Sequence, residues 1–277
     1  MADAMIRVGQ SELQHGKAND RVYLMKLSRS DFPDIIDVIE RLAAEHHYSK
    51  IIAKVPIWAE QGFKEREYEI ESQVPNFYDG IEDACFLARY PDSDRKNRAD
   101  RESITQIVHT AMIAPKLDAA DLPDCFTCAI LRPGETEDLA ALYRAVFRSY
   151  PFPIFDADYL KETMDSHIVY FGIREKGRLV AASSCEMDAM HRNVEMTDFA
   201  TLGDCRAKGF ASFLLSNMEQ EMCRRKMATA YTIARSMSYG MNITFAKNRY
   251  TFAGTLFNNT DISGEIESMN VWYKALQ

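Results

Sequence analysis

Hydrophobic positions in the second half of the chain follow two alternating periods. Short apolar runs rich in β-branched and aromatic residues predict strands, whereas apolar positions three or four residues apart predict helices. Strands are predicted at 126–131, 168–174, 179–187, 194–201, 229–234, 252–257 and 265–274. Helices are predicted at 135–150, 156–164, 209–226 and 239–248. The resulting order, β-α-α-β-β-β-α-β-α-β-β, predicts an α/β fold with a mixed sheet flanked by helices.

The first ninety residues show a shorter and less regular version of this alternation. Strands are predicted at 22–27, at 51–55, near 64–70 and at 84–89. Helices are predicted at 31–46 and, as a short helix, ending at 59–63. This pattern predicts a smaller α/β unit, and a generic α/β extension of the main domain is its alternative.

Two polar segments separate these halves. Residues 91–101 are charge-dense, and 115–123 carry a proline at each end, as is typical of linkers and exposed loops. Between them, Ile104, Ile107 and Val108 lie on one side of a predicted short helix. We therefore divide the chain into a partial α/β domain at 1–92, a linker with a short helix at 93–124, and a main domain at 125–277.

Composition and charge exclude several classes of partner. The chain is 47% hydrophobic and 27% charged, with a net charge of −8, which argues against nucleic acid or an anionic membrane. An acidic surface instead tolerates a cationic small molecule. No apolar run approaches the roughly 18 residues of a membrane span, and 1–20 lack the apolar core of a signal peptide. We expect a cytoplasmic protein.

The cysteine and histidine spacings do not predict a metal site. Six cysteines are scattered along the chain, as in a reduced cytosolic protein. Cys125 and Cys128 form one C-x-x-C pair, but in a strand residues three apart point to opposite faces. The pair His46-His47 also lacks a metal-binding spacing. We predict no metal.

The most informative stretch is 197–215, which reads as a buried strand, a tight loop and the start of an amphipathic helix. Arg206, Gly209 and Ala211 stand at the junction in the order Arg-x-x-Gly-x-Ala. A helix start presents free backbone N–H groups and the positive end of the helix dipole, which suits a pyrophosphate. Gly209 allows close approach of the backbone, and Ala211 keeps the first turn small.

This loop, together with the element order, resembles the GNAT acyltransferases, whose signature is Arg/Gln-x-x-Gly-x-Gly/Ala. Gln61-Gly62-Phe63 before a predicted strand pair resembles the last third of a GNAT domain, so the first half reads as a partial GNAT-like unit without a phosphate loop. The resemblance implies that the fourth and fifth strands splay apart and that acetyl-CoA, as co-substrate, fills the gap. The residues implied to bind it are Phe199, Ala200, Thr201, Arg206, Ala207, Lys208, Gly209, Phe210, Ala211, Ser212, Ser238 and Phe245.

Several stretches are more specifically similar to the β-lysine N6-acetyltransferase family. They are 234–242, 254–259, 264–274 and Tyr150-Pro151-Phe152-Pro153. The resemblance implies transfer of acetyl to the terminal amine of a small diamino acid, β-lysine, to give the compatible solute N6-acetyl-β-lysine. Two alternatives stay open: the acceptor is a polyamine or a protein lysine, or the chain is a catalytically silent module that senses an acyl-CoA or an amino acid. A homodimer is one candidate for its assembly.

An amine acceptor must lose a proton before it attacks. With a pKa near 10.4, a lysine-type amine costs about 4–5 kcal/mol to deprotonate at pH 7. A carboxylate can take that proton directly or through water. Strand alternation places Glu195, Thr197, Phe199 and Thr201 on one face of the fourth strand and Asp198 on the other. We predict Glu195 as the base; the other candidates are Asp198, Glu186 and Asp188, and each of the four is alternatively an exposed strand-end charge.

The general acid is less defined. GNAT enzymes often place a tyrosine in the last helix, in a pattern like Tyr-x-x-x-Gly-Phe, but here Phe245 takes the tyrosine position and Arg249 the glycine position. Tyr239 and Tyr250 are nearby substitutes. A thiol with a pKa near 8.5 also leaves without an acid.

A diamino acid requires donors for its carboxylate, acceptors for its nearby amine and apolar groups for its methylenes. The predicted donors are Asn242, Arg249 and Arg235, and the predicted acceptors are Glu186, Asp188 and Glu267. Tyr150 and Phe152 are predicted to line the methylene chain.

Overall fold

The computed structural model describes residues 3–97, 100–116, 121–262 and 264–276. Its strands are β1 (Ala4–Val8), β2 (Ser11–Gly16), β3 (Arg21–Lys26), β4 (Lys50–Pro56), β5 (Glu69–Tyr78), β6 (Glu82–Arg89), β7 (Phe126–Ile130), β8 (Ile168–Glu175), β9 (Arg178–Asp188), β10 (Asn193–Thr201), β11 (Thr229–Arg235), β12 (Thr251–Ile262) and β13 (Glu265–Ala275). Its α-helices are α1 (Ile35–His46), α2 (Glu60–Lys64), α3 (Arg101–Met112), α4 (Thr136–Val146), α5 (Ala157–Ser166), α6 (Phe210–Arg224) and α7 (Tyr239–Lys247).

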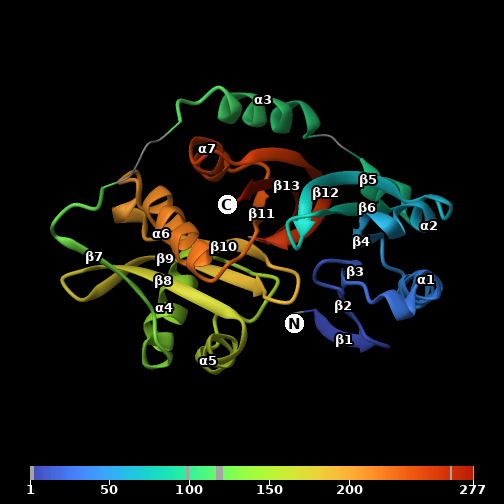
Figure 1. Cartoon of the computed structure of the whole chain (residues 1–277), viewed down its shortest axis with the longest axis horizontal. Helices are drawn as coiled ribbons and strands as arrows, with labels where there is room; N and C mark the ends of the chain where they lie inside the picture. The colour runs from blue at the N-terminus through green and yellow to red at the C-terminus, as the bar shows by residue number, and fades with distance from the viewer. Residues whose placement is uncertain (1–2, 98–99, 117–120, 263, 277) are drawn as a thin grey trace.

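All of these strands join one sheet, in the order β1-β2-β3-β4-β6-β5-β12-β13-β11-β10-β9-β8-β7 (Figure 1). The two halves meet where β5 pairs antiparallel with β12 through Ser72 and Gly254. Gly254 has φ +148, and a Cβ there would lie 2.2 Å from the carbonyl oxygen of Glu71, so this crossing requires glycine. The expected mixed sheet flanked by helices is confirmed.

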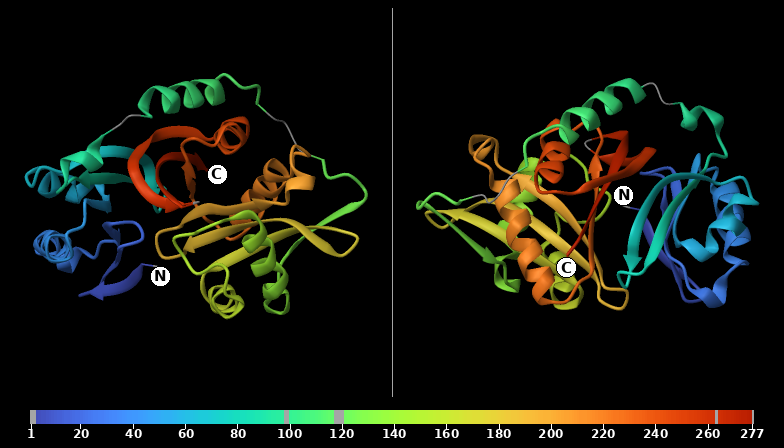
Figure 2. Two further views of the ribbon diagram at one scale, coloured as in Figure 1. Left: turned by 180° about the vertical axis from the view of Figure 1, so that it is seen from behind. Right: turned by 45° about the horizontal axis from the view of Figure 1, so that its top comes forward.

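Helices cover both faces of the second half. Leu214 and Met218 of α6 pack against β8 to β11, whereas Leu139 of α4 and Leu160 of α5 pack in a separate cluster on the opposite face. Figures 1 and 2 show α6 on one side of this part of the sheet and α4 and α5 on the other. Helix α3 lies within the predicted linker and packs against α7, with Ile104 among its buried residues.

The first half covers only one face of its strands with helices. Ile36 and Ile39 of α1 pack on Leu24 of β3 and its neighbours. The other face, which carries Tyr23, Ile52 and Phe86, packs against residues of β11, β12 and β13 in the second half. The curled sheet therefore brings the first half against β11, β12 and β13 of the main domain (Figure 2).

The strand predictions needed correction at four strands. β1 and β2 were not predicted, because β1 is largely exposed and β2 carries polar residues such as Ser11 and Gln14. β5 begins at Glu69 rather than near 64, since α2 and its C-terminal turn occupy the preceding residues. β12 continues through the polar residues Asn258, Asn259 and Thr260.

Candidate active site

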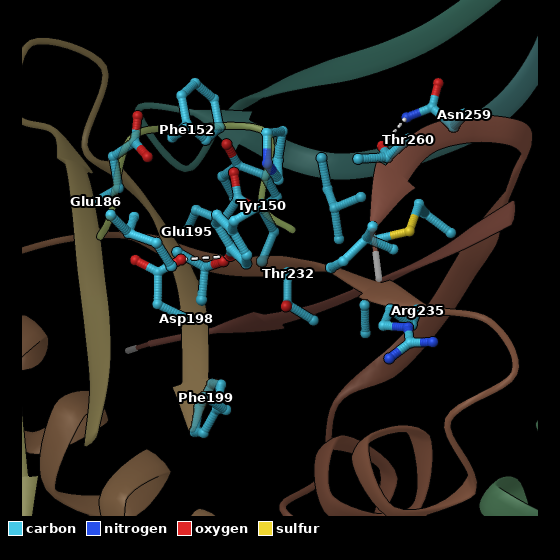
Figure 3. Close-up of a pocket in the computed structure, with 18 of the residues that line it drawn as sticks. Tyr150, Phe152, Glu186, Glu195, Asp198, Phe199, Thr232, Arg235, Asn259 and Thr260 are labelled. Carbon is cyan, nitrogen blue, oxygen red and sulfur yellow. Dashed lines mark hydrogen bonds between the residues drawn. The ribbon is translucent and has the colours of Figure 1, made fainter. Parts of the chain in front are cut away.

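The strands β10 and β11 pair only at one end. Their parallel register covers 193–195 against 229–231, and beyond Glu195 and Tyr231 the strands separate. Thr197 to Phe199 on one strand and Thr232 to Arg235 on the other line a cavity of about 180 Å³ in the gap (Figure 3). The splayed strands implied by the GNAT resemblance are therefore present.

A second hollow, a groove of about 600 Å³, adjoins this cavity. It is lined by the loop at 205–212, by Phe199 and Thr201 of β10, and by Ser238 at the start of α7. Phe147, Phe199, Arg235 and Met241 line both spaces, so the groove and the cavity share a wall. A molecule bound along the groove would reach the cavity at Phe199.

The loop that borders the groove has the conformation an anion site needs. Gly209 is the N-cap of α6 with φ 79, in the left-handed region that favours glycine, and Ala207 has φ 61. The helix begins at Phe210, so the N–H groups of its first turn lack intrahelical acceptors. All seven predicted residues of the loop, Arg206 to Ser212, line the groove.

A β-bulge places Asp198 on an unexpected face. The register between β10 and β9 shifts between Thr197 and Ala200, and Asp198 has φ 54. Val194 and Met196 pack with α6, whereas Ala200 packs in the cluster of α4 and α5. The predicted alternation is wrong from Asp198 onward, because the extra residue reverses the faces.

As a result, Glu195 and Asp198 line the same cavity. Asp198 is buried; its Oδ2 accepts a hydrogen bond from Ser184 Oγ at 2.6 Å, and its Oδ1 accepts one from the hydroxyl of Tyr150. Figure 3 shows this pair beside Glu195. Burial raises the pKa of Asp198, and these two hydrogen bonds oppose the rise. Both carboxylate oxygens are thus already engaged.

Glu195 has the more suitable acid-base character. Burial, reinforced by the charge of Glu186 on β9, raises the pKa of Glu195 to about 7. Lys54 and a hydrogen bond from Tyr231 oppose this rise. A carboxyl group with this pKa is close to half ionised near neutral pH and can take up a proton from a bound amine.

The first half of the chain completes the cavity. Arg21, Tyr23 and Met25 of β3 and Lys54 of β4 belong to its lining. Lys54 Nζ donates to the Tyr231 hydroxyl at 3.1 Å, and burial lowers the pKa of Lys54 while the nearby carboxylates raise it. Arg21 and Lys54 were not predicted from the sequence. The signal that could have indicated them is a cation within or beside an otherwise apolar strand.

Of the other predicted site residues, some line the cavity and some do not. Those in the cavity lining are Tyr150, Phe152, Glu186, Arg235 and Phe245. The side chain of Ala200 packs in the core, which leaves its backbone for the predicted pantetheine contact.

Five predicted residues line neither space, and we withdraw their roles: Asp188, Asn242, Arg249, Glu267 and Tyr239. Asn242 is buried, its amide NH₂ donates to the carbonyls of Arg235, Ser236 and Ser238, and its Oδ1 accepts from Asn270 and Trp272. Asp188 contacts His191 at 3.1 Å, and Glu267 accepts from Arg235 Nε at 2.9 Å. Tyr239 is 46% exposed. Tyr250, the other substitute acid, packs in the core beside Phe245.

The described residues hold no group of three or more His, Cys, Asp or Glu side chains arranged for a metal ion. None of the helices in the described ranges has both the length and the apolar character of a membrane span.

Comparison with protein-family profiles found no match. Among curated proteins, a β-lysine N6-acetyltransferase of Methanococcus maripaludis is 38% identical over 98% of this chain and 98% of its own length. The N-acetyltransferase YodP of Bacillus subtilis is 31% identical over 95% of each chain. A β-lysine N6-acetyltransferase of Methanosarcina mazei is 30% identical over 88% of this chain and 98% of its own length.

Solved N-acetyltransferase structures align with about half of the chain. The ribosomal-protein-S18-alanine N-acetyltransferase of Escherichia coli covers 55% of this chain and 94% of its own, with a TM-score of 0.48 at 12% identity. The identity to full-length relatives, together with the observed strand order, shows the family. The chain is an N-acetyltransferase of GNAT fold that belongs to the β-lysine N6-acetyltransferase family.

Proposed function

We propose that this chain transfers acetyl from acetyl-CoA to the terminal amine of β-lysine, giving N6-acetyl-β-lysine. The observation that carries the proposal is the position of Glu195, whose pKa is raised to about 7, in the cavity. This cavity shares a wall with the groove that Arg206 and Gly209 border. The named activity of the relatives at 38% and 30% identity supports the choice of acceptor.

Acetyl-CoA would lie along the groove. Its pyrophosphate would bind the N–H groups and positive helix end at 206–211, and its pantetheine arm would pair with the free edge of β10 at Phe199 to Thr201. In this arrangement the thioester reaches the shared wall at Phe199.

The chemistry is a nucleophilic acyl substitution. Glu195 takes a proton from the terminal ammonium, and the freed amine attacks the thioester carbonyl to form the C–N bond. A backbone N–H of β10 stabilises the oxyanion. The C–S bond then breaks, the nitrogen releases its second proton to solvent, and coenzyme A departs as a thiolate. The thiolate takes a proton from solvent, because no tyrosine of the described residues in α7 lines the cavity.

The product has one positive charge fewer than β-lysine and is a neutral zwitterion. A small and highly soluble molecule without net charge is suited to accumulation as a compatible solute. We propose that the product has this role in the cytoplasm. The substrate-side partner is accordingly a small cationic amine.

The acceptor is tested by comparing kcat/KM for β-lysine, α-lysine, ornithine, cadaverine and a lysine-containing peptide. A site built to bind a polar group rejects an analogue without it far more strongly than it rejects a change of one methylene. We therefore expect β-lysine to exceed cadaverine, which lacks the carboxylate, by at least on the order of 10²-fold, with smaller differences among amino acids of different length. Equal rates with cadaverine or the peptide would contradict the proposal and favour a polyamine or protein acceptor.

The cofactor site is tested by Gly209→Asp. Aspartate at φ 79 is strained and places a negative charge beside the expected phosphates. Acetyl-CoA should stabilise the wild type by about 2.7 kcal/mol at a hundredfold excess over Kd, and the variant should lose this thermal shift. Gly177→Asp is the matched control, because Gly177 has φ 88 but lies in the turn between β8 and β9, outside the groove. A shift retained in Gly209→Asp would rule out this loop.

A further inference from the structure

Arg21 is a buried cation at the cavity wall without a carboxylate partner. Its side chain is 4% exposed, and none of the ion pairs between described residues includes it. Lys50 lies opposite Arg21 where β3 pairs with β4, and unlike Arg21 it forms an ion pair, with Glu71 at 2.9 Å. Burial lowers the pKa of Arg21 to about 10, so the guanidinium stays charged at neutral pH.

The groups that Arg21 does contact are all neutral. Its Nη1 donates to the carbonyl oxygen of Asn259 at 2.5 Å and to Thr260 Oγ1 at 3.1 Å. Its Nη2 donates to Gln14 Oε1 at 3.2 Å, and its Nε has no acceptor among the described residues. The guanidinium also lies over the ring of Tyr23, 5.2 Å from its centroid. A buried charge that contacts only neutral groups is costly, and an anion in the cavity would relieve that cost.

Thr260 adds a donor at the same place. Its Oγ1 accepts from Arg21 and, at 3.2 Å, from Asn259 Nδ2. With both acceptor positions of the oxygen taken, its O–H hydrogen finds no acceptor among the residues that the structure describes. Arg21 and Thr260 together therefore provide a cation and a hydroxyl donor, the pairing that a carboxylate accepts.

The carboxylates and the Arg21–Thr260 pair lie on different sides of the cavity. Glu186, Glu195 and Asp198 line it from β9 and β10, whereas Thr260 and Asn259, which accept hydrogen bonds from Arg21, lie on the opposite side (Figure 3). A ligand with an amine near the shared wall and a carboxylate at the other end would match both groups. A diamine would bring an ammonium to Arg21.

We propose that Arg21, with Thr260, binds the carboxylate of the acceptor amino acid, so that the first half of the chain selects an amino acid over a diamine. This inference rests on the proposed function. It replaces the predicted carboxylate donors, since Asn242 is engaged by the backbone and Arg235 pairs with Glu267.

The test measures kcat and KM of wild type and Arg21→Gln with β-lysine and with cadaverine. We expect the variant to lose about 10²-fold in kcat/KM for β-lysine, mainly through KM, and to keep or gain activity with cadaverine. Arg21→Lys keeps the charge but loses the planar fork and should be intermediate. Equal losses with both substrates would overturn the proposal, because a structural role lowers both.

Arg95→Gln is the matched control. Arg95 also bridges the halves, donating to the carbonyls of Asn258 at 2.7 Å and Asn19 at 2.8 Å, but it does not line the cavity. The Arg95→Gln substitution should leave the preference for β-lysine over cadaverine unchanged. If Arg21→Gln does not fold, Thr260→Val provides the test, with an expected loss of about tenfold for β-lysine only.

The outcomes separate this proposal from the proposed function. A wild type that does not prefer β-lysine over cadaverine contradicts the function itself. A wild type that does prefer β-lysine, with a preference that survives in Arg21→Gln and Thr260→Val, contradicts only the role of Arg21.

Discussion

Glu195→Gln is expected to lower kcat/KM for β-lysine by on the order of 10²–10⁴-fold while leaving acetyl-CoA affinity unchanged. Glutamine keeps the size and hydrogen-bonding capacity of the side chain but cannot accept the ammonium proton. The wild-type profile of kcat/KM should rise with pH through about 7, where Glu195 loses its proton. The pH profile of kcat/KM for the variant should lack this rise.

Glu186→Gln is the matched control for this prediction. Glu186 lies opposite Glu195 in the β9–β10 register and lines the same cavity, and its charge contributes to the raised pKa of Glu195. Removing that charge should shift the rise of kcat/KM with pH to lower pH and leave turnover at high pH nearly intact. Near-normal turnover in Glu195→Gln would assign the proton transfer to Asp198 or to water.

Stability gives a second readout for Glu195. Its pKa is raised on folding from 4.5 to about 7, so between these values the folded protein binds more protons than the unfolded chain. The contribution of Glu195 to stability is therefore present below pH 4.5 and is lost as pH rises to 7. The melting temperature of Glu195→Gln should improve relative to the wild type over this window, which also shows that lost activity is not lost folding.

Glu71→Ala is expected to lower the free energy of unfolding by about 3–5 kcal/mol. Glu71 and Lys50 form an ion pair at 2.9 Å with side chains 2% and 0% exposed, and Lys50 Nζ also donates to the carbonyl of Phe257 at 2.6 Å. Alanine would leave Lys50 buried without a counter-charge at the junction between β5 and β12. Denaturant unfolding measures the loss.

Two comparisons make this result specific. The double variant Lys50→Met/Glu71→Leu should recover most of the stability, because it removes both charges and fills the site with apolar groups. Arg7→Ala breaks an exposed pair with Glu12 at 2.9 Å and should cost no more than about 1 kcal/mol. A loss of under 1 kcal/mol in Glu71→Ala would show that this pair does not hold the halves together.

The phosphate loop and the order of elements in the second half follow from local sequence. Gly209 at the start of α6 adopts φ 79, and the predicted helix at 209–226 is found as Phe210–Arg224. Such features depend on backbone preferences and on hydrophobic periods within a few residues, so a single sequence carries them. Glu195 was predicted in the same way, from its position in an apolar strand.

The face of Asp198 could not be predicted locally. Alternation along β10 holds only while its register with β9 is regular, and the bulge after Thr197 depends on that partner strand. Tyr150, predicted only as part of an apolar lining, donates to Asp198 from the segment between α4 and α5. Contacts between distant segments decide such side-chain roles.

The sequence by itself therefore determined the fold of the main domain, the anion-binding helix start and the family resemblance, because each resides in short contiguous patterns. Only the tertiary structure decided that the first half supplies two of the cations of the cavity. Arg21 and Lys54 lie more than a hundred residues from Glu195 in the chain, and they reach its cavity because the sheet continues from β5 to β12 and curls. The way a long sheet curls is set by packing across its whole surface, which no local pattern encodes.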